Sequence, residues 1–247
     1  MSASLMALLV VGMVATSFLS GIFGMAGGLI LMGVLLGLLP LPEAMALHAV
    51  TQIASNGWRG LLWWRHIRWR PALTFLAGCG LAVVAFSFWR YVPAKGVALV
   101  LLGVAPFVVQ AAPVRLKPNP ERFTHGAVYG ATAMTLMLLA GVSGPLIDAY
   151  FLGGSLQRRQ IVATKAVCQI CGHAAKFVYF GGLVEEAARL DPLLASLAVL
   201  ASMLGTSLAR PMLERLTDTQ YRIWARRIIT TIAVGYLVHG STLLVWS

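Results

Sequence analysis

Apolar residues run almost without interruption along this chain, and this pattern restricts the fold more than any other feature. The first run covers residues 5–39; the positions that interrupt and close it are Gly21, Gly24, Gly27, Gly28, Pro40 and Pro42. The further runs cover residues 44–64, 71–89, 94–114, 124–141, 144–154, 159–181, 192–209 and 226–246. A helix that crosses a bilayer needs about 20 largely apolar residues. The pattern therefore predicts an all-α, polytopic membrane protein with roughly 8–10 hydrophobic segments, some of them broken or re-entrant.

Composition and charge exclude other classes of protein. Of the 247 residues, 59% are hydrophobic and 11% are charged, which leaves no room for a soluble domain. The formal net charge of +11 would suit a nucleic-acid-binding protein. However, apolar segments separate the basic clusters, so no soluble surface remains to form a groove. We therefore expect the chain to form one integral membrane domain in contact with the lipid bilayer, and we expect no nucleic acid as a partner.

The basic residues indicate how the chain crosses the membrane. Lys and Arg gather in short cytoplasmic loops, and here they cluster at residues 65–70, 115–122, 158–159 and 210–227. With these connections inside, both termini lie on the periplasmic side of the inner membrane. Residues 1–6 contain no Lys or Arg, so they lack the basic region of a cleavable signal peptide. We expect the first hydrophobic segment to be retained.

A repeated pentapeptide indicates an internal duplication. Residues 49–53 read Ala-Val-Thr-Gln-Ile, and residues 166–170 read Ala-Val-Cys-Gln-Ile. A Gly-x-x-Gly pattern at residues 21–24 recurs at residues 141–144, a few residues off the same offset. Polar residues also fall on polar residues when the two pentapeptides are aligned.

The two copies have opposite orientation. The first is followed by the basic residues 65–70, and the second by Glu185 and Glu186, so the loops lie on opposite sides of the membrane. We predict two inverted repeats, residues 1–117 and 118–247. Inverted repeats with glycine-interrupted segments are typical of secondary transporters, whose substrate binds near the midplane between the repeats. Broken helices also present N–H groups and positive dipole ends, which suit an anion.

The sequence resembles the TauE/SafE family of sulfite exporters, also called the toluene sulfonate uptake permease family. The resemblance is most specific in the glycine-rich segment 18–28, the Pro40-Leu-Pro42 turn and residues 44–59, and it covers essentially the whole chain. It implies transport of sulfur-containing oxyanions, such as sulfite or an organosulfonate, without ATP. The organosulfonate branch of the family is the most similar.

Polar residues at helical spacing form a candidate substrate site. Each half carries three of them one turn apart, which places each trio on one helix face; they are His48, Gln52, Asn56, Lys165, Gln169 and His173. The two glutamine amides either donate hydrogen bonds to a sulfur oxyanion or join the repeats by interhelical hydrogen bonds. Lys165 either pairs with the substrate charge or extends to the cytoplasmic interface. His173 either binds the anion or a proton, or is a neutral histidine bonded to a neighbouring helix.

The glycine pair Gly27-Gly28 favours a helix break at which bare backbone approaches the anion, and a helix-packing role is the alternative. In the second half this pair has no match, and Pro145 and Asp148 appear instead. Asp148 either carries a coupling proton, caps a broken helix, or pairs with Lys165 or with Lys176.

Two further basic residues lie about two turns beyond the glutamines. Arg59 and Lys176 are expected to act as gate or interface cations, and binding of the substrate is the alternative. The Cys168-x-x-Cys171 spacing lies in an apolar helix without a second cysteine pair, so we interpret both cysteines as packing residues and expect no metal.

Motifs of catalysis are missing from the sequence. It has no His-Glu-x-x-His, no Gly-x-Ser-x-Gly and no Walker sequence, so we expect neither an enzyme nor ATP coupling, and no cofactor. The candidate partners are a small anionic sulfur-containing substrate, the bilayer, a coupling proton and a second copy of the chain. The alternative function is an anion channel, or a carrier for a different small oxyanion.

Overall fold

The computed structural model describes residues 3–23, 26–89, 91–111, 118–152, 156–180 and 190–245. The described residues form ten α-helices and one 3-10 turn, so the all-α prediction is confirmed. The elements are α1 (Ala3–Phe23), α2 (Ala26–Leu38), α3 (Leu41–Leu62), η1 (Trp64–His66), α4 (Trp69–Trp89), α5 (Lys95–Ala111), α6 (Phe123–Ala140), α7 (Gly144–Leu152), α8 (Arg158–Val178), α9 (Pro192–Arg215) and α10 (Asp218–Val245).

Four of these helices are long and apolar enough to cross a bilayer. Their apolar parts are Ser4–Phe23, Trp69–Trp89, Phe123–Ala140 and Pro192–Met212, and three shorter apolar helices accompany them. Large apolar side chains lie on the outside, and Phe88 is 87% exposed. Such a surface suits lipid tails rather than water. The chain is a multi-pass membrane protein.

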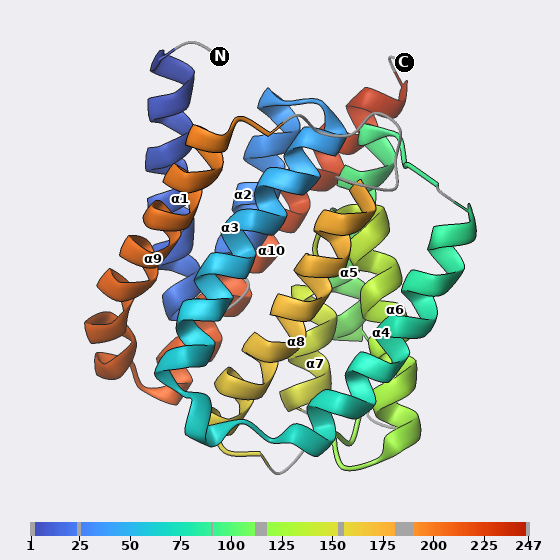
Figure 1. Ribbon diagram of the computed structural model, residues 1–247, viewed down its shortest axis with the longest axis vertical. Helices are drawn as coiled ribbons and strands as arrows, with labels where there is room; N and C mark the ends of the chain where they lie inside the picture. Colours follow the sequence, from blue (N-terminus) through green and yellow to red (C-terminus); the bar gives the residue numbers. More distant parts are fainter. Residues whose placement is uncertain are drawn as a thin grey trace.

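Two further helices, α3 and α8, have the length of a span but fall outside this apolar set, because they carry polar residues. They pack against each other, α3 also packs against α9, and α8 also packs against α4. The α3–α8 pair therefore lies between two outer pairs, α1 with α9 and α4 with α6, as Figure 1 shows. Burial between protein elements explains how helices with so many polar side chains are tolerated.

Glycine brings the outer helices into backbone contact. A Cβ added at Gly78 of α4 would lie 1.9 Å from the carbonyl oxygen of Ala127 in α6. A Cβ added at Gly205 of α9 would lie 2.3 Å from the carbonyl oxygen of Val14 in α1. Small residues permit this close approach, which is a common way of joining helices in membranes.

The chain termini and some of the connections between helices lie at opposite ends of the molecule. In Figure 1, α1 begins and α10 ends at the same end, while the α3–α4 connection and the α9–α10 turn lie at the other. The prediction of a basic connection across residues 210–227 is wrong, because α9 continues to Arg215 and α10 begins at Asp218. Arginine is a good helix former, and its long side chain can reach the membrane interface from within a helix.

The predicted break at Gly27-Gly28 is misplaced. Helix α2 begins at Ala26, so both glycines lie in its first turn and α1 ends before them. A Cβ added at Gly27 would lie 1.7 Å from the carbonyl oxygen of Thr16 in α1. The pair therefore serves close approach of α1 and α2, which is the packing alternative.

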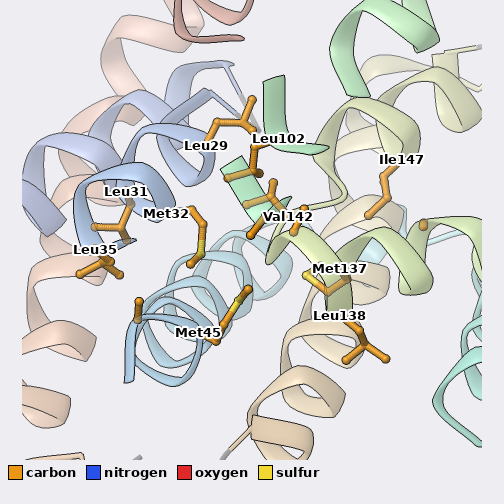
Figure 2. Close-up of a cluster of buried hydrophobic side chains, with 14 of the residues drawn as sticks. Leu29, Leu31, Met32, Leu35, Met45, Leu102, Met137, Leu138, Val142 and Ile147 are labelled. Carbon is orange, nitrogen blue, oxygen red and sulfur yellow. The ribbon is translucent and has the colours of Figure 1, made fainter. Parts of the chain in front are cut away.

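In the second half, Gly141 ends α6. Its φ of 81° favours glycine, and its N–H donates to the carbonyl oxygen of Met137 at 2.9 Å. A Cβ there would lie 2.7 Å from the sulfur of Met32 and 2.7 Å from that of Met45. Figure 2 shows these flexible side chains packed with their aliphatic neighbours at the α6–α7 corner. The corner therefore sits in the apolar core directly beside α2 and α3.

Candidate functional site

The helices α3 and α8 each bury a row of polar side chains. The six members are His48, Gln52, Asn56, Lys165, Gln169 and His173, and all are buried. One-turn spacing predicted a common face within each helix, and the burial of every member places both faces inside the protein. An unpartnered polar group in such a place is costly, so the contacts of each side chain carry information about function.

The two helices run in opposite directions, so the first part of α3 meets the last part of α8 (Figure 1). There, Lys176 Nζ lies 2.7 Å from His48 Nδ1 and donates to the carbonyl oxygen of Gly141 at 2.9 Å. His48 Nε2 lies 2.9 Å from the carbonyl oxygen of Gly28. We call this group, together with His173, the His48–Lys176 cluster.

Hydrogen-bond chemistry fixes the arrangement of protons in this cluster. A carbonyl oxygen only accepts, so His48 Nε2 carries a hydrogen and donates it to Gly28. This leaves Nδ1 as the acceptor for Lys176. A second proton on the pair would set two N–H groups against each other, so His48 and Lys176 together hold at most one positive charge.

The charge of Lys176 has no carboxylate beside it within the described residues. Lys176 is 0% exposed, and its described contacts are His48 and the Gly141 carbonyl. Both contacts accept hydrogen bonds, but neither supplies a negative charge. A buried cation normally requires a counter-charge.

His173 completes the His48–Lys176 cluster. Its ring centroid lies 5.4 Å from that of His48, and its Nδ1 atom is buried with no hydrogen-bond partner among the described residues. The Oε1 atom of Gln169, one turn earlier, is also buried with no hydrogen-bond partner among the described residues. Two unsatisfied polar groups on one buried face require a partner such as a ligand or an ordered water.

The backbone of α2 closes this face at Gly28. A Cβ added at Gly28 would lie 3.2 Å from Oε1 of Gln52, so no side chain separates α2 from the Gln52 amide. Gly28 thus meets α3 twice, through this contact and through its carbonyl group on His48. Bare backbone at Gly28 therefore contacts α3 side chains from within a helix, and its approach to an anion stays a prediction.

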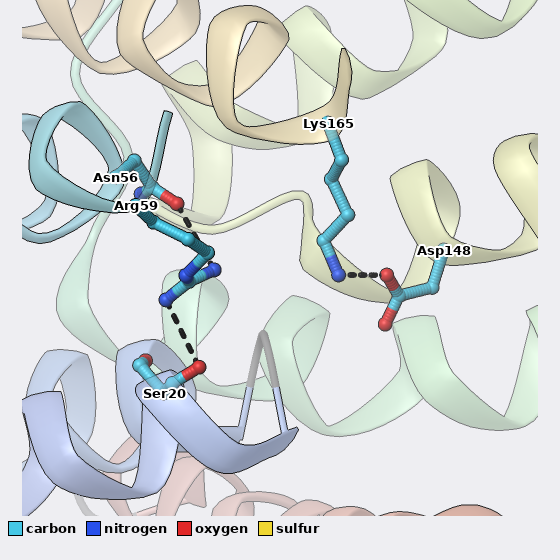
Figure 3. A network of polar contacts seen from close by, with 5 residues as sticks. All are labelled: Ser20, Asn56, Arg59, Asp148 and Lys165. Atoms are coloured by element: carbon cyan, nitrogen blue, oxygen red, sulfur yellow. Dashed lines mark hydrogen bonds and ion pairs between the residues drawn. The ribbon is translucent and has the colours of Figure 1, made fainter. Parts of the chain in front are cut away.

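At the other end of the α3–α8 pair, Lys165 forms an ion pair with Asp148 of α7, shown in Figure 3. The lysine side chain is 6% exposed and the carboxylate 13%. Of the alternatives for Asp148, pairing with Lys165 is the contact that forms. The lysine does not extend to the interface, since its ammonium group is held by this carboxylate.

Arg59 and Asn56 lie in the same region (Figure 3). Arg59 donates to Oδ1 of Asn56 at 3.3 Å and to the carbonyl oxygen of Ser20, near the end of α1, at 2.9 Å. Asn56 Nδ2 donates to the backbone carbonyl of Gln52 at 2.8 Å. Arg59 therefore joins α3 to the end of α1, much as Lys176 joins α8 to the end of α6 through Gly141.

Sequence reasoning overlooked the polar residues of α1. The hydroxyl oxygens of Ser17 and Ser20 are buried and have no hydrogen-bond partner among the described residues. Thr16, Ser17 and Ser20 are three hydroxyl residues close together near the end of a largely apolar helix, and this was the available signal. Thr16 and Ser20 lie beside Gly27 of α2, and Ser20 also accepts from Arg59, so α1 contributes to the site region, while Ser17 lies beside Gly205 of α9.

Comparison with known proteins agrees with this picture. A family model described as sulfite exporter TauE/SafE matches residues 8–236, which is nearly the whole chain. No curated protein and no solved structure matches it. Members of the family are transporters, not enzymes, and the family implies membrane transport of sulfur anions. With its matched length, its apolar spans and its polar α3–α8 centre, the chain belongs to the TauE/SafE family of sulfite exporters.

Proposed function

We propose that this protein is a secondary transporter that moves a sulfur-containing oxyanion, an organosulfonate or sulfite, by alternating access around a site between α3 and α8. The observation that carries the proposal is the burial of Lys176 without a carboxylate among its described contacts. The lysine is fully buried, and its described partners are a histidine nitrogen and a backbone carbonyl. A cation in the membrane interior is costly unless it faces a partner or cavity, and an anionic substrate supplies the missing charge.

The substrate ligands follow from the same geometry. Lys176 supplies the charge, and His48 and His173 flank it at the same end of the α3–α8 pair. The amides of Gln52 and Gln169 are one turn away on the same faces and can donate to the oxygens of an SO3 group. Gly28 keeps side-chain bulk out of this region.

The remaining candidates, Asn56, Arg59, Lys165 and Asp148, lie toward the other end of the pair, where they hold α1 and α7 against the centre. We assign them to gating, since contacts between the α3–α8 pair and the helices α1 and α7 are the ones that alternating access must change. A proton that couples to transport through Asp148 would have to compete with its ion pair to Lys165.

The packing pattern supports the proposal of inverted repeats over residues 1–117 and 118–247. If α1 to α5 correspond to α6 to α10, then the contact of α1 with α9 has its counterpart in the contact of α6 with α4. The contacts of α3 with α8 and of α5 with α10 then each join equivalent helices. This pattern is expected of two similar units related by a pseudo-two-fold axis. The proposal places both termini outside and the basic connections in the cytoplasm.

Purified protein in proteoliposomes tests the function. We expect saturable uptake of radiolabelled taurine, sulfoacetate, 4-toluenesulfonate or sulfite, accelerated when the same unlabelled anion is inside. A channel would show flux without this trans-stimulation, and transport of none of these anions would contradict the proposal.

A thermal-shift measurement in detergent tests the site with the same anions. A ligand at a hundredfold excess over its dissociation constant stabilises the folded state by about 2.7 kcal/mol. We expect this shift in the native protein and a smaller one in the Gln52→Ala, Gln169→Ala variant. An equal shift in both would remove the glutamines from the site.

A further inference from the structure

The two halves of the protein differ at one position that faces the α3–α8 pair. In the first half, Gly28 lies seven residues after Gly21 of the Gly-x-x-Gly segment. In the second half, Asp148 lies seven residues after Gly141 of the matching segment. The repeated pentapeptide likewise aligns His48 with Lys165, since each directly precedes it.

The contacts in the structure follow this alignment. His48 of α3 meets Gly28 of α2, and Lys165 of α8 meets Asp148 of α7. The aligned basic residues therefore reach the aligned positions of the short helices. In the second half the short helix offers a carboxylate, whereas in the first half it offers a glycine and only its backbone carbonyl.

We propose that Asp148 is a tethered counter-ion, which occupies in the second half the position that the anionic group of the substrate takes in the first half. The proposal rests on the transport function proposed above and deepens it. One anion then binds per chain, at the His48–Lys176 cluster beside Gly28. The pseudo-equivalent position at Lys165 is closed to substrate because the chain supplies its own anion there.

Two observations support an unmet counter-charge and an unmet hydrogen bond in the first half, and a third shows which side chain borders the position. Lys176 is buried without a carboxylate among its described contacts. His173 Nδ1 is buried beside this cluster without a hydrogen-bond partner among the described residues. A Cβ added at Gly28 would lie 3.2 Å from Oε1 of Gln52, so the Gln52 amide lies directly beside this glycine and can reach a ligand there. The second half has the opposite property, because its ammonium and carboxylate groups satisfy each other.

The first test removes the tethered anion. Asp148→Asn keeps the size of the side chain and leaves Lys165 without a counter-charge. In calorimetric titrations of the purified protein with 4-toluenesulfonate and with sulfite, we expect one bound anion per native chain and two per Asp148→Asn chain. The matched control, Asp148→Asn with Lys165→Met, removes both charges and should return the stoichiometry to one.

The second test adds a tethered anion to the first half and does not depend on the stability of Asp148→Asn. Gly28→Asp places a carboxylate next to His48 and the Gln52 amide. We expect it to weaken anion binding about tenfold more than the isosteric, uncharged Gly28→Asn variant does, since a charge in the site competes with the substrate.

The outcomes separate the two proposals. If the native protein binds one sulfur anion, but Asp148→Asn also binds one and Gly28→Asp behaves like Gly28→Asn, the tethered counter-ion is wrong and the transport function stands. Two anions on the native chain would also overturn it. If the native protein binds none of the sulfur anions, the proposed function fails, and this inference fails with it.

Discussion

The central pair of helices and the outer pairs are held together by different kinds of contact. In α1–α9 and α4–α6, glycine brings apolar helices into backbone contact, as at Gly205 and Gly78. In α3–α8, buried side chains meet through charge and hydrogen bonds, as at His48 with Lys176. Lipid offers the outer helices no hydrophobic reason to associate, so close packing has to hold them. The centre can then carry charges that would be too costly on a lipid-facing surface.

This difference predicts that changes in the centre alter binding, whereas changes in the outer pairs alter stability. The largest effect is expected for Lys176→Met. Removing one partner of a buried charge pair costs about 2–5 kcal/mol of binding free energy, which is about thirtyfold or more in the dissociation constant. Thermal-shift titration with the transported sulfur anion measures this loss.

The unfolding temperature without ligand should fall in Lys176→Met, because His48 Nδ1 and the Gly141 carbonyl lose their buried donor, so the dissociation constant is measured where both proteins are folded. The matched control is Lys95→Met, at the start of α5 and away from α3 and α8, which should bind the anion normally. Unaltered binding by Lys176→Met would show that the charge of Lys176 does not recognise the substrate.

A smaller effect, on stability, is expected in the outer pair α4–α6. Gly78→Ala would place its Cβ 1.9 Å from the backbone oxygen of Ala127, so the helices must separate. Overpacking of this kind typically costs about 1–3 kcal/mol. Unfolding in mixed micelles measures the loss, and the anion dissociation constant of the folded protein should not change.

Gly80, on the same helix, is the control for Gly78. An added Cβ there has no atom within 4 Å, so Gly80→Ala should be neutral or stabilise by up to about 1 kcal/mol, because alanine favours the helix. If Gly78→Ala and Gly80→Ala have equal stability, close packing does not hold the α4–α6 pair. A weakened anion affinity in Gly78→Ala would contradict the expectation that changes in the outer pairs alter stability and not binding.

The sequence predicted the periphery better than the centre. Apolar runs locate the outer helices, because a lipid-facing span must be apolar along its length. Helical spacing also placed His48, Gln52 and Asn56 on one buried face. Spacing within a helix, however, does not say which helix ends meet. The contact of His48 with Lys176 depends on how two distant segments cross.

Other differences have local physical causes. Asp148 had two lysines as candidate partners in the sequence, and the short α7 brings it to Lys165. The Gly27-Gly28 pair reads as a helix break, since glycine has little helix propensity. Close contact with the Thr16 carbonyl instead requires glycine within a continuous helix. The contact between α1 and α2 therefore outweighs the low helix propensity of glycine, and a single sequence does not show that contact.

The smallest predicted effect lies where the two regions meet. Ser55 of α3 and Thr206 of α9 share a buried hydrogen bond of 2.9 Å between their hydroxyl groups. Interhelical hydrogen bonds in membrane proteins contribute about 0.6 kcal/mol on average, because the unfolded chain in the membrane also finds partners. A double-mutant cycle with Ser55→Ala and Thr206→Val, followed by unfolding in mixed micelles, should give a coupling of about this size. A coupling of about 2 kcal/mol or more would mean that polar contacts also hold the outer helices to the centre. The separation of roles between close packing and polar contacts would then not extend to α9.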